Sequence, residues 1–296
     1  MSTIEKALEK LQQGGEAINS HVPMTEKSHA NENLERALHD VSQVKTAQIH
    51  SHTSRKRNLD LERLARSGFL TPESGRSQLA EEMRHIKRPI LLNTVNATSE
   101  NPVANLIMVT SARPSEGKSF TSLNLAMSIA KERDKTVLLV DADIAKPGLT
   151  RLLDMDSEKG LVDYLLDDTL DLSDVIIKTN VPSFRFIPAG RRHIHSTELL
   201  ASQSMIALAH DLSKRYPDRI VIFDSPPLLA TSEAAVVSSL VGQIIMVVEA
   251  EKTSKQELNE SLGLIDQSDK YVGLVLNKTR GSFGSEYYGY YSSYGD

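Results

Sequence analysis

A glycine-containing loop with a lysine and a serine at its end occupies residues 112–119, which read Ala-Arg-Pro-Ser-Glu-Gly-Lys-Ser. This order fits the phosphate-binding P-loop pattern, with alanine in place of the first glycine. The glycine lets the backbone approach a phosphate, the lysine brings positive charge to the β- and γ-phosphates, and the serine hydroxyl can ligate Mg²⁺. We therefore expect an ATP site made by Pro114, Ser115, Glu116, Gly117, Lys118, Ser119 and Phe120.

Acidic residues follow two apolar runs further along the chain. Asp141 and Asp143 come directly after Val137–Val140, and Asp224 follows Ile220–Phe223. A single aspartate at a strand end is common in α/β turns, but acids after two strands behind a P-loop indicate magnesium-assisted phosphoryl transfer.

Roles follow from the chemistry of these side chains. The predicted Mg²⁺ ligands are Ser119, Asp141 and Asp224, and the predicted catalytic residues are Lys118, Asp141 and Asp143. Asp141 could hold the ion through water or orient a nucleophile, and Asp143, on the same side of an extended segment, could assist as a base. A helix cap ahead of Pro147 is the structural alternative for both aspartates.

Asn277 and Lys278 close the last apolar run of the chain. An asparagine there can hydrogen-bond an adenine edge while the lysine stem packs over the ring, so both are predicted to bind nucleotide. Ordinary loop polarity is the alternative. His193 and His195 form an isolated pair that we interpret as surface polar groups.

The elements that must position these residues alternate regularly from about residue 103. Apolar runs of strand length lie at 105–112, 136–143, 184–190, 219–226, 243–250 and 271–279. Helical periodicity marks 119–133, 205–216, 232–241 and 255–268. The pattern predicts an α/β fold, with a central, mostly parallel sheet covered by helices on both faces and ligands at the carboxyl ends of its strands.

The chain divides into three parts by composition. Residues 1–75 are polar and read as a flexible or partly helical extension, residues 76–280 as the P-loop domain, and residues 281–296 as a tail. A short charged helix is expected over 76–90, ending before Pro89. Glu81, Arg84 and Lys87 share one face of it, which is either a solvated face or an oligomer contact.

The tail contains mainly glycine, serine and tyrosine. Five of the chain's eight tyrosines fall there: Tyr287, Tyr288, Tyr290, Tyr291 and Tyr294. Glycine and serine would let such a segment reach a neighbouring molecule.

Overall composition excludes several classes of function. A formal net charge of −5 argues against nucleic-acid binding driven by bulk charge, and the absence of cysteine excludes disulfides and thiolate chemistry. No apolar run approaches the roughly 20 residues that span a bilayer, and the N-terminus lacks a signal-peptide pattern. We expect a cytoplasmic protein that reaches a membrane only through a partner.

The three motifs, in this order and with the tyrosine-rich end, resemble those of the bacterial tyrosine kinases of polysaccharide biosynthesis (BY-kinases). The resemblance covers roughly residues 80–296: Ser111–Ser119 is similar to the family's Walker A motif, Val137–Pro147 to its Walker A′ motif, and Ile220–Pro227 to its Walker B motif. It implies ATP- and Mg²⁺-dependent autophosphorylation of the tail in trans within a ring-shaped homo-oligomer. It also implies activation by a membrane chain-length-determinant protein at the inner face of the plasma membrane.

Two positions depart from the family's pattern. The helix motif ExxRxxR of the ring contact ends here in Lys87, which keeps the charge but cannot make a bidentate contact. The Walker A′ pattern DxDxR has Ala145 at its arginine position, with Lys146 beside it.

Two other readings stay open. One is a P-loop ATPase of the partitioning or septum-positioning type, acting as a nucleotide switch without kinase activity. The other is an interaction protein with a structural nucleotide and an associating tail. The tyrosine cluster favours the kinase.

Overall fold

The computed structural model describes residues 55–95, 101–191, 196–215 and 218–279. All of them belong to the compact unit His52–Asp296. The expected extension up to residue 54 and the tail lie outside the described residues.

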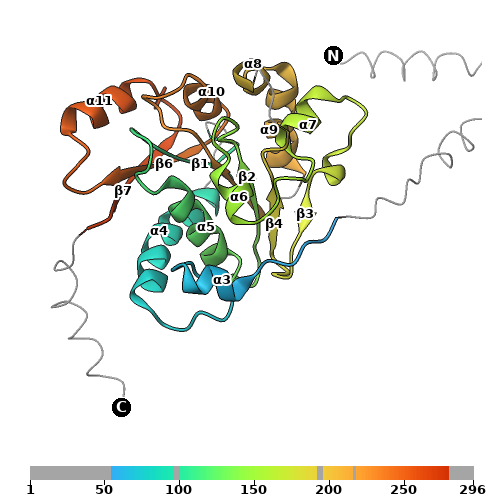
Figure 1. The fold of residues 1–296 in the computed structure, drawn as a ribbon. Coiled ribbons are helices and arrows are strands. Elements are labelled where there is room, and N and C mark those ends of the chain that lie inside the picture. Colours follow the sequence, from blue (N-terminus) through green and yellow to red (C-terminus); the bar gives the residue numbers. More distant parts are fainter. Residues whose placement is uncertain (1–54, 96–100, 192–195, 216–217, 280–296) are drawn as a thin grey trace, which may run out of the picture. The chain divides into compact units, whose positions relative to one another are not determined.

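A single seven-stranded sheet forms the centre of the unit, in the order β3-β4-β2-β5-β1-β6-β7 (Figure 1). The strands are β1 Leu106–Ser111, β2 Thr136–Asp141, β3 Ile177–Lys178, β4 Phe184–Ile187, β5 Arg219–Asp224, β6 Gln243–Glu249 and β7 Tyr271–Asn277. Every neighbouring pair is parallel except β3 with β4. The predicted α/β fold is confirmed, and each predicted strand is present; only the two-residue β3 was not expected.

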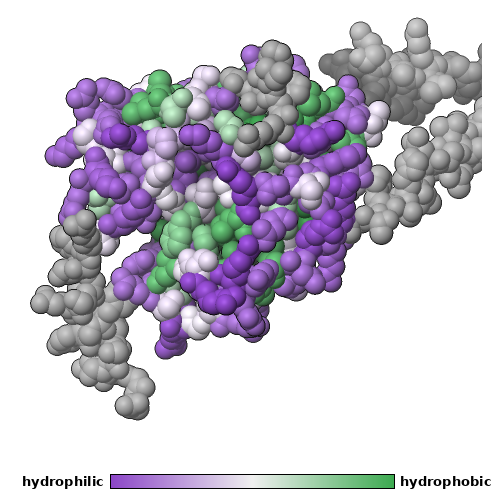
Figure 2. All heavy atoms as spheres, viewed as in Figure 1, coloured by the Kyte–Doolittle hydropathy of each residue, from purple (hydrophilic) through white to green (hydrophobic). Residues whose placement is uncertain are grey.

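Helices cover both faces of this sheet. One face carries α3 Leu61–Arg66, α4 Gln78–Val95, α5 Lys118–Ile129 and α6 Gly148–Leu152. The other carries α7 Leu161–Leu166, α8 Ser196–Leu200, α9 Gln203–Lys214 and α10 Glu233–Ser239, with η1 Leu172–Asp174 and α11 Lys255–Gly263 at its margin. Figure 2 shows hydrophobic residues near the middle of the viewed face, over α4 and α5, with mainly hydrophilic residues around them.

Alternation along the central strands divides the core into two layers. In β1, Ile107 and Val109 face the α4–α5 side, whereas Leu106 and Met108 face the α9–α10 side, and all four are fully buried. A strand buried on both faces is apolar throughout, which is why these strands appear in the sequence as continuous runs.

Helix α4 runs past the point at which the sequence predicted its end. Pro89 lies inside it, although proline lacks the N–H for the bond to the carbonyl four residues earlier. Beyond the proline, Ile90 is buried and Asn93 donates to the Gln243 side chain at 3.0 Å. Tertiary packing of the last two turns therefore outweighs the local preference for a stop.

Residues 55–75 pack on the domain, so the packed region begins earlier than the expected boundary at residue 76. Leu59, Leu64 and Leu70 are buried in the core beside α5, and the Asn124 side chain accepts from the Leu70 N–H at 2.7 Å. Around Lys56 the chain also bridges β3 at Lys178, which covers that edge of the sheet. Within the described part of the chain, no helix is long and apolar enough to cross a membrane.

Candidate functional site

The P-loop connects the buried strand β1 to the N-terminus of α5. Gly117 has φ 104°, a left-handed conformation that favours glycine, and a Cβ there would lie 2.0 Å from the Asn277 side-chain nitrogen. Lys118 begins the helix and is buried. The loop amides and the helix N-terminus therefore offer the anion site that the sequence predicted.

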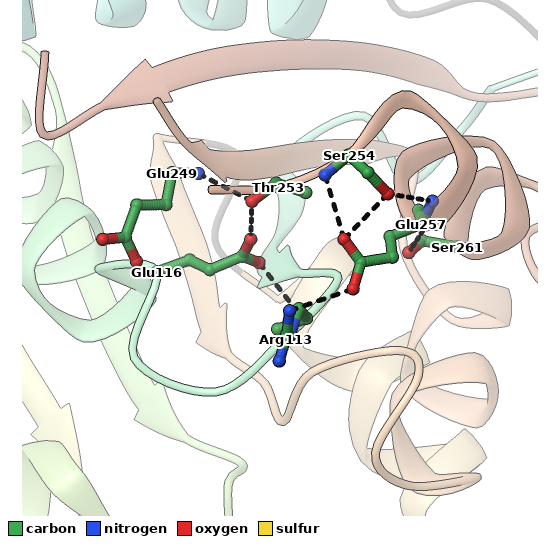
Figure 3. A network of polar contacts seen from close by, with 7 residues as sticks. All are labelled: Arg113, Glu116, Glu249, Thr253, Ser254, Glu257 and Ser261. Carbon is green, nitrogen blue, oxygen red and sulfur yellow. Dashed lines mark hydrogen bonds and ion pairs between the residues drawn. The ribbon is translucent and has the colours of Figure 1, made fainter. Parts of the chain in front are cut away.

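A polar network holds this loop against the β6–α11 connection (Figure 3). The buried Glu116 carboxylate accepts from the Arg113 N–H at 2.8 Å and from the Thr253 hydroxyl. The Arg113 guanidinium pairs with Glu257 at 3.0 Å, and Glu257 also caps α11 with Ser254. The Glu116 side chain thus stabilises the conformation of the loop. Only the backbone of Glu116 remains available to contact a nucleotide.

The end of β7 contacts the same loop. Asn277 Nδ2 donates to the Glu116 carbonyl at 2.8 Å, and Lys278 Nζ donates to the Ser115 carbonyl at 2.7 Å. Lys278 also pairs with Glu249 at 3.2 Å. Both predicted nucleotide-binding residues lie beside the P-loop, and their contact with adenine stays a prediction.

The two strand-end aspartates, Asp141 and Asp224, lie side by side. They are register partners on the adjacent strands β2 and β5, and both are fully buried. Asp141 Oδ2 accepts from the backbone N–H and the hydroxyl of Thr150, each at 2.8 Å. Asp141 Oδ1 has no partner among the described residues.

Asp224 is bound to two serines of α5. Ser119 Oγ donates to Asp224 Oδ2 at 2.6 Å, and Ser122 Oγ donates to Oδ1 at 2.9 Å. These contacts join the Walker A serine to the Walker B aspartate, and their shared binding of Mg²⁺ stays a prediction.

Burial shapes the electrostatics of this pair. Burial, followed by the neighbouring Asp224 carboxylate, raises the pKa of Asp141 to about 8. Burial also raises the pKa of Asp224 to about 6, against the opposing effects of the Ser119 hydrogen bond and the Lys118 charge. Two adjacent buried carboxyl groups with raised pKa values would be stabilised by a cation.

The residues present fit Mg²⁺. The free Asp141 oxygen and the Ser119 and Asp224 oxygens are the hard ligands that this ion prefers. No group of three or more His, Asp or Glu side chains with metal-binding spacing occurs in the part of the chain that the structure describes. Two carboxylates and one hydroxyl suit an ion that keeps waters and takes further oxygens from substrate phosphates.

Asp143 lies next to this centre. Burial raises its pKa, while the Lys118 charge opposes the shift, so the lysine acts electrostatically on both Asp143 and Asp224. Asp143 Oδ1 also accepts from the Lys146 N–H at 3.1 Å. Ala145 and Lys146 are exposed.

The remaining predicted residues lie elsewhere. The ring of Phe120 packs against that of Phe69 in a tilted arrangement, with ring centroids 5.3 Å apart. On α4, Glu81 pairs with Arg84 and both are partly exposed, whereas Lys87 is buried and binds Glu132 at 2.6 Å and the Ser128 carbonyl at 2.9 Å. Lys87 therefore fastens α4 to α5 within one molecule and does not share the accessible surface of the other two. The five tail tyrosines lie outside the described residues.

Three residues of the site are absent from the predicted set. Ser122 lies one turn after Ser119 on the same helix face, and this spacing could have indicated it. Thr253 approaches Glu116 from a distant segment, and Thr150 meets Asp141 from the short helix α6 nine residues further on, so no motif indicates either.

The P-loop and the buried strand-end aspartates beside it define a nucleotide-binding domain of the P-loop class. A family model described as an AAA domain matches residues 104–277, which is more than half of the chain. The chain is 30% identical over 217 residues to the putative tyrosine-protein kinase CapB of Staphylococcus aureus, covering 73% of this chain and 91% of that protein.

Solved structures agree with this assignment. The BceF tyrosine kinase domain superposes with a TM-score of 0.59 at 28% identity, covering 79% of this chain and 88% of that one. The chimerical protein CapA2B2 shares the fold, with a TM-score of 0.61 at 24% identity, covering 75% of this chain and 100% of that one. The chain belongs to the bacterial tyrosine-protein kinases, and it is a tyrosine autokinase of capsule and exopolysaccharide synthesis. The predicted family and enzyme class are confirmed.

Proposed function

We propose that this kinase transfers the γ-phosphoryl group of ATP to the tyrosines at 287–294 of a neighbouring copy, with Mg²⁺ held by Ser119, Asp141 and Asp224. The observation that supports this proposal most directly is the buried pair Asp141–Asp224. The two aspartates are register partners, Asp224 accepts from the P-loop serine, and the Lys118 charge acts on Asp224. Two adjacent carboxylates beside a P-loop can bind the cation that accompanies the phosphates of ATP.

The proposed step transfers one phosphoryl group. The phenolic oxygen forms a bond to the γ-phosphorus, the bond from that phosphorus to the bridging oxygen breaks, and ADP leaves. Asp141, which would hold Mg²⁺ through a water and so keep its Oδ1 open, accepts the phenolic proton. Lys118 balances negative charge on the phosphates, and bound Mg²⁺ would supply further charge neutralisation.

A mixing experiment tests transfer between copies. Lys118→Met in the full chain provides tail tyrosines without the phosphate-binding lysine, and a chain truncated at Gly281 provides the active site without the tail. Phosphotyrosine on the Lys118→Met chain, found only when both proteins are present with Mg-ATP, is the expected result. A mixture in which the wild-type chain becomes phosphorylated while the Lys118→Met chain stays free of phosphotyrosine would overturn transfer in trans.

We further propose that phosphorylation separates the oligomer. Five phosphotyrosines would add roughly −8 to −10 charge per copy, at about −1.5 to −2 each, and such tails repel one another in a ring. Native mass spectrometry before and after Mg-ATP treatment should show a shift to smaller species. An unchanged oligomer with fully phosphorylated tails would contradict this part.

The proposal includes a membrane chain-length-determinant protein as activator. Its support is the resemblance described above and the relatedness to CapB, since the chimera of like fold carries CapA in its name beside CapB. The test is the rate of tail phosphorylation with and without the cytoplasmic segments of such a protein from the same genome. No change in rate would remove the activator from the proposal.

A further inference from the structure

Strand β7 forms an open edge of the sheet. It pairs with β6 on one side, and no segment within the described ranges pairs with its other side. Its side chains are nevertheless apolar: Leu274 is 57% exposed, Leu276 is 63% exposed and Tyr271 is 40% exposed. A long apolar edge strand is a template for another strand, and folded proteins ordinarily cover or blunt it.

A groove adjoins this edge on the α4 side. It has a volume of about 540 Å³ and lies between one face of α4 and the last two strands. Ile86, Pro89 and Ile90 of α4 line it, together with Tyr271 and Val275 of β7. An apolar strand added to β7 would therefore find side-chain space on this face as well as backbone partners.

The opposite edge of the sheet shows how this protein covers a strand. The Arg57 N–H donates to the Lys178 carbonyl, and the Lys178 N–H donates to the Arg55 carbonyl, each at 2.9 Å, so a segment of the same chain closes β3. This contrast raises the question of what closes the β7 edge.

We propose that the chain's own C-terminal segment, residues 280–296, pairs with β7 as an antiparallel eighth strand. The segment follows β7 directly and has 17 residues, enough for a hairpin loop of about two to five residues and a strand as long as β7. It contains no proline, and its tyrosines favour strands. A segment tethered at the strand end reaches this edge at high effective concentration, ahead of a second copy.

Docking there places the tyrosine cluster over Leu274, Leu276 and the groove. The docked tail is then a resting state that withholds its tyrosines from a neighbour's active site. A tail that leaves β7 and is phosphorylated by a neighbour does not dock again, because a phosphate carrying about −1.5 to −2 charge is costly to place on an apolar surface. The release, but not the docking, depends on the proposed kinase function.

Hydrogen exchange without ATP tests the docking itself. The compared proteins are the full chain, a chain ending at Gly281, and a control ending at Tyr291 that keeps the proposed strand. Those amides of 271–277 that point away from β6 should exchange at least about tenfold more slowly in the full chain and in the control than in the chain ending at Gly281. Equal exchange in all three overturns the proposal. So does protection that persists without the tail and rises with protein concentration, because a second copy would then be the occupant.

The same measurement after Mg-ATP tests the release. Protection of 271–277 should fall in the wild type as phosphotyrosine appears and persist in Lys118→Met. Protection that survives full phosphorylation overturns the release. Absence of phosphotyrosine would refute the kinase proposal and leave the docking result unaffected, so the two failures are distinguishable.

Discussion

Asp141 is the residue on which the chemistry depends most. Its carboxyl group lies between Thr150, which holds one oxygen, and Asp224, whose negative charge opposes its ionisation. Its other oxygen is unpaired within the described part of the molecule. In the absence of a cation, this arrangement costs stability that is recovered when Mg²⁺ and nucleotide bind.

Asp141→Asn should separate stability from activity. The neutral amide keeps an oxygen for Thr150 and removes the repulsion with Asp224. In EDTA at pH 8 the variant should therefore be more stable than the wild type, by on the order of 1 kcal/mol in the free energy of unfolding or roughly 2–4 °C in Tm. Because the folded pKa of Asp141 lies above its unfolded value, wild-type stability falls as pH rises from about 4 to 8. The advantage of the variant should therefore grow over that range.

Kinase activity of Asp141→Asn should fall about 10²–10⁴-fold, the typical contribution of a general base. Stability is measured by thermal melts with EDTA, repeated with Mg-ATP. Activity is measured as the rate of phosphotyrosine formation. A variant that is less stable without metal and fully active would contradict the role given to Asp141.

Local sequence predicted the residues of this site better than their surroundings. Lys118, Ser119 and Asp224 were predicted because each chemistry follows from the type of residue and its place after an apolar strand. Thr150 and Thr253 were not, because Thr150 meets Asp141 through the turn that leads into α6 and Thr253 meets Glu116 from the β6–α11 connection, and both courses depend on tertiary packing. The same limit applies to Lys87, whose burial against α5 cannot be read from helical spacing.

At the scale of elements, the P-loop is shaped by its neighbours. The β6–α11 connection supplies Thr253 to the buried Glu116 carboxylate, and the end of β7 supplies Asn277 and Lys278 to the loop carbonyls. Ser115 adopts a φ of 71° in this loop, which an L-residue rarely does. The surrounding contacts offset the cost of that conformation.

Thr253→Val should weaken ATP binding through the loop. The change keeps the side-chain shape, removes a donor to a buried carboxylate, and should cost about 1–3 kcal/mol of stability. ATP affinity, measured by calorimetry, should fall as well. Thr179→Val, which removes a buried hydroxyl bonded to the Val181 and Phe184 carbonyls away from the P-loop, is the matched control: it should lower stability by about 1–3 kcal/mol and leave ATP affinity unchanged. Equal ATP affinity in both variants would contradict the bracing role of Thr253.

Asp163 fixes the start of α7 in a pH-dependent way. Burial raises its pKa, but the Arg191 guanidinium at 2.5 Å and the Gly160 and Arg191 N–H groups outweigh it and hold the pKa below its ordinary value. The stabilisation is therefore present above about pH 4 and lost as pH falls through the lowered pKa.

Asp163→Asn should unfold at lower urea concentration than wild type at pH 7, and the difference should shrink toward pH 3. Urea titrations across this range measure it. A difference that is constant with pH would show that the carboxylate charge is unimportant.

At the scale of the whole molecule, alternating apolar strands and helices were enough to predict a covered parallel sheet. The end of α4 was mispredicted, because packing of Ile90 and Asn93 carries the helix past Pro89. The packing of residues 55–75 was missed, because scattered leucines in a polar segment do not reveal that they meet a core built by the rest of the chain.

Assembly should depend on Arg84 and not on Lys87. Arg84→Ala removes an accessible charge from α4 and should reduce oligomerisation while leaving the melting temperature nearly unchanged. Lys87→Met removes buried contacts with Ser128 and Glu132 and should lower the stability of the monomer. Native mass spectrometry and thermal melts on both variants distinguish the two effects. Normal assembly of Arg84→Ala would exclude this face of α4 as the contact.

The most direct test of the central claim is to map phosphotyrosine by mass spectrometry after incubating the chain with Mg-ATP, beside Lys118→Met. The account predicts phosphate on the tyrosines at 287–294 of the wild type and none on those of the variant. Turnover of ATP by the wild type without any phosphotyrosine would contradict it and favour a nucleotide switch.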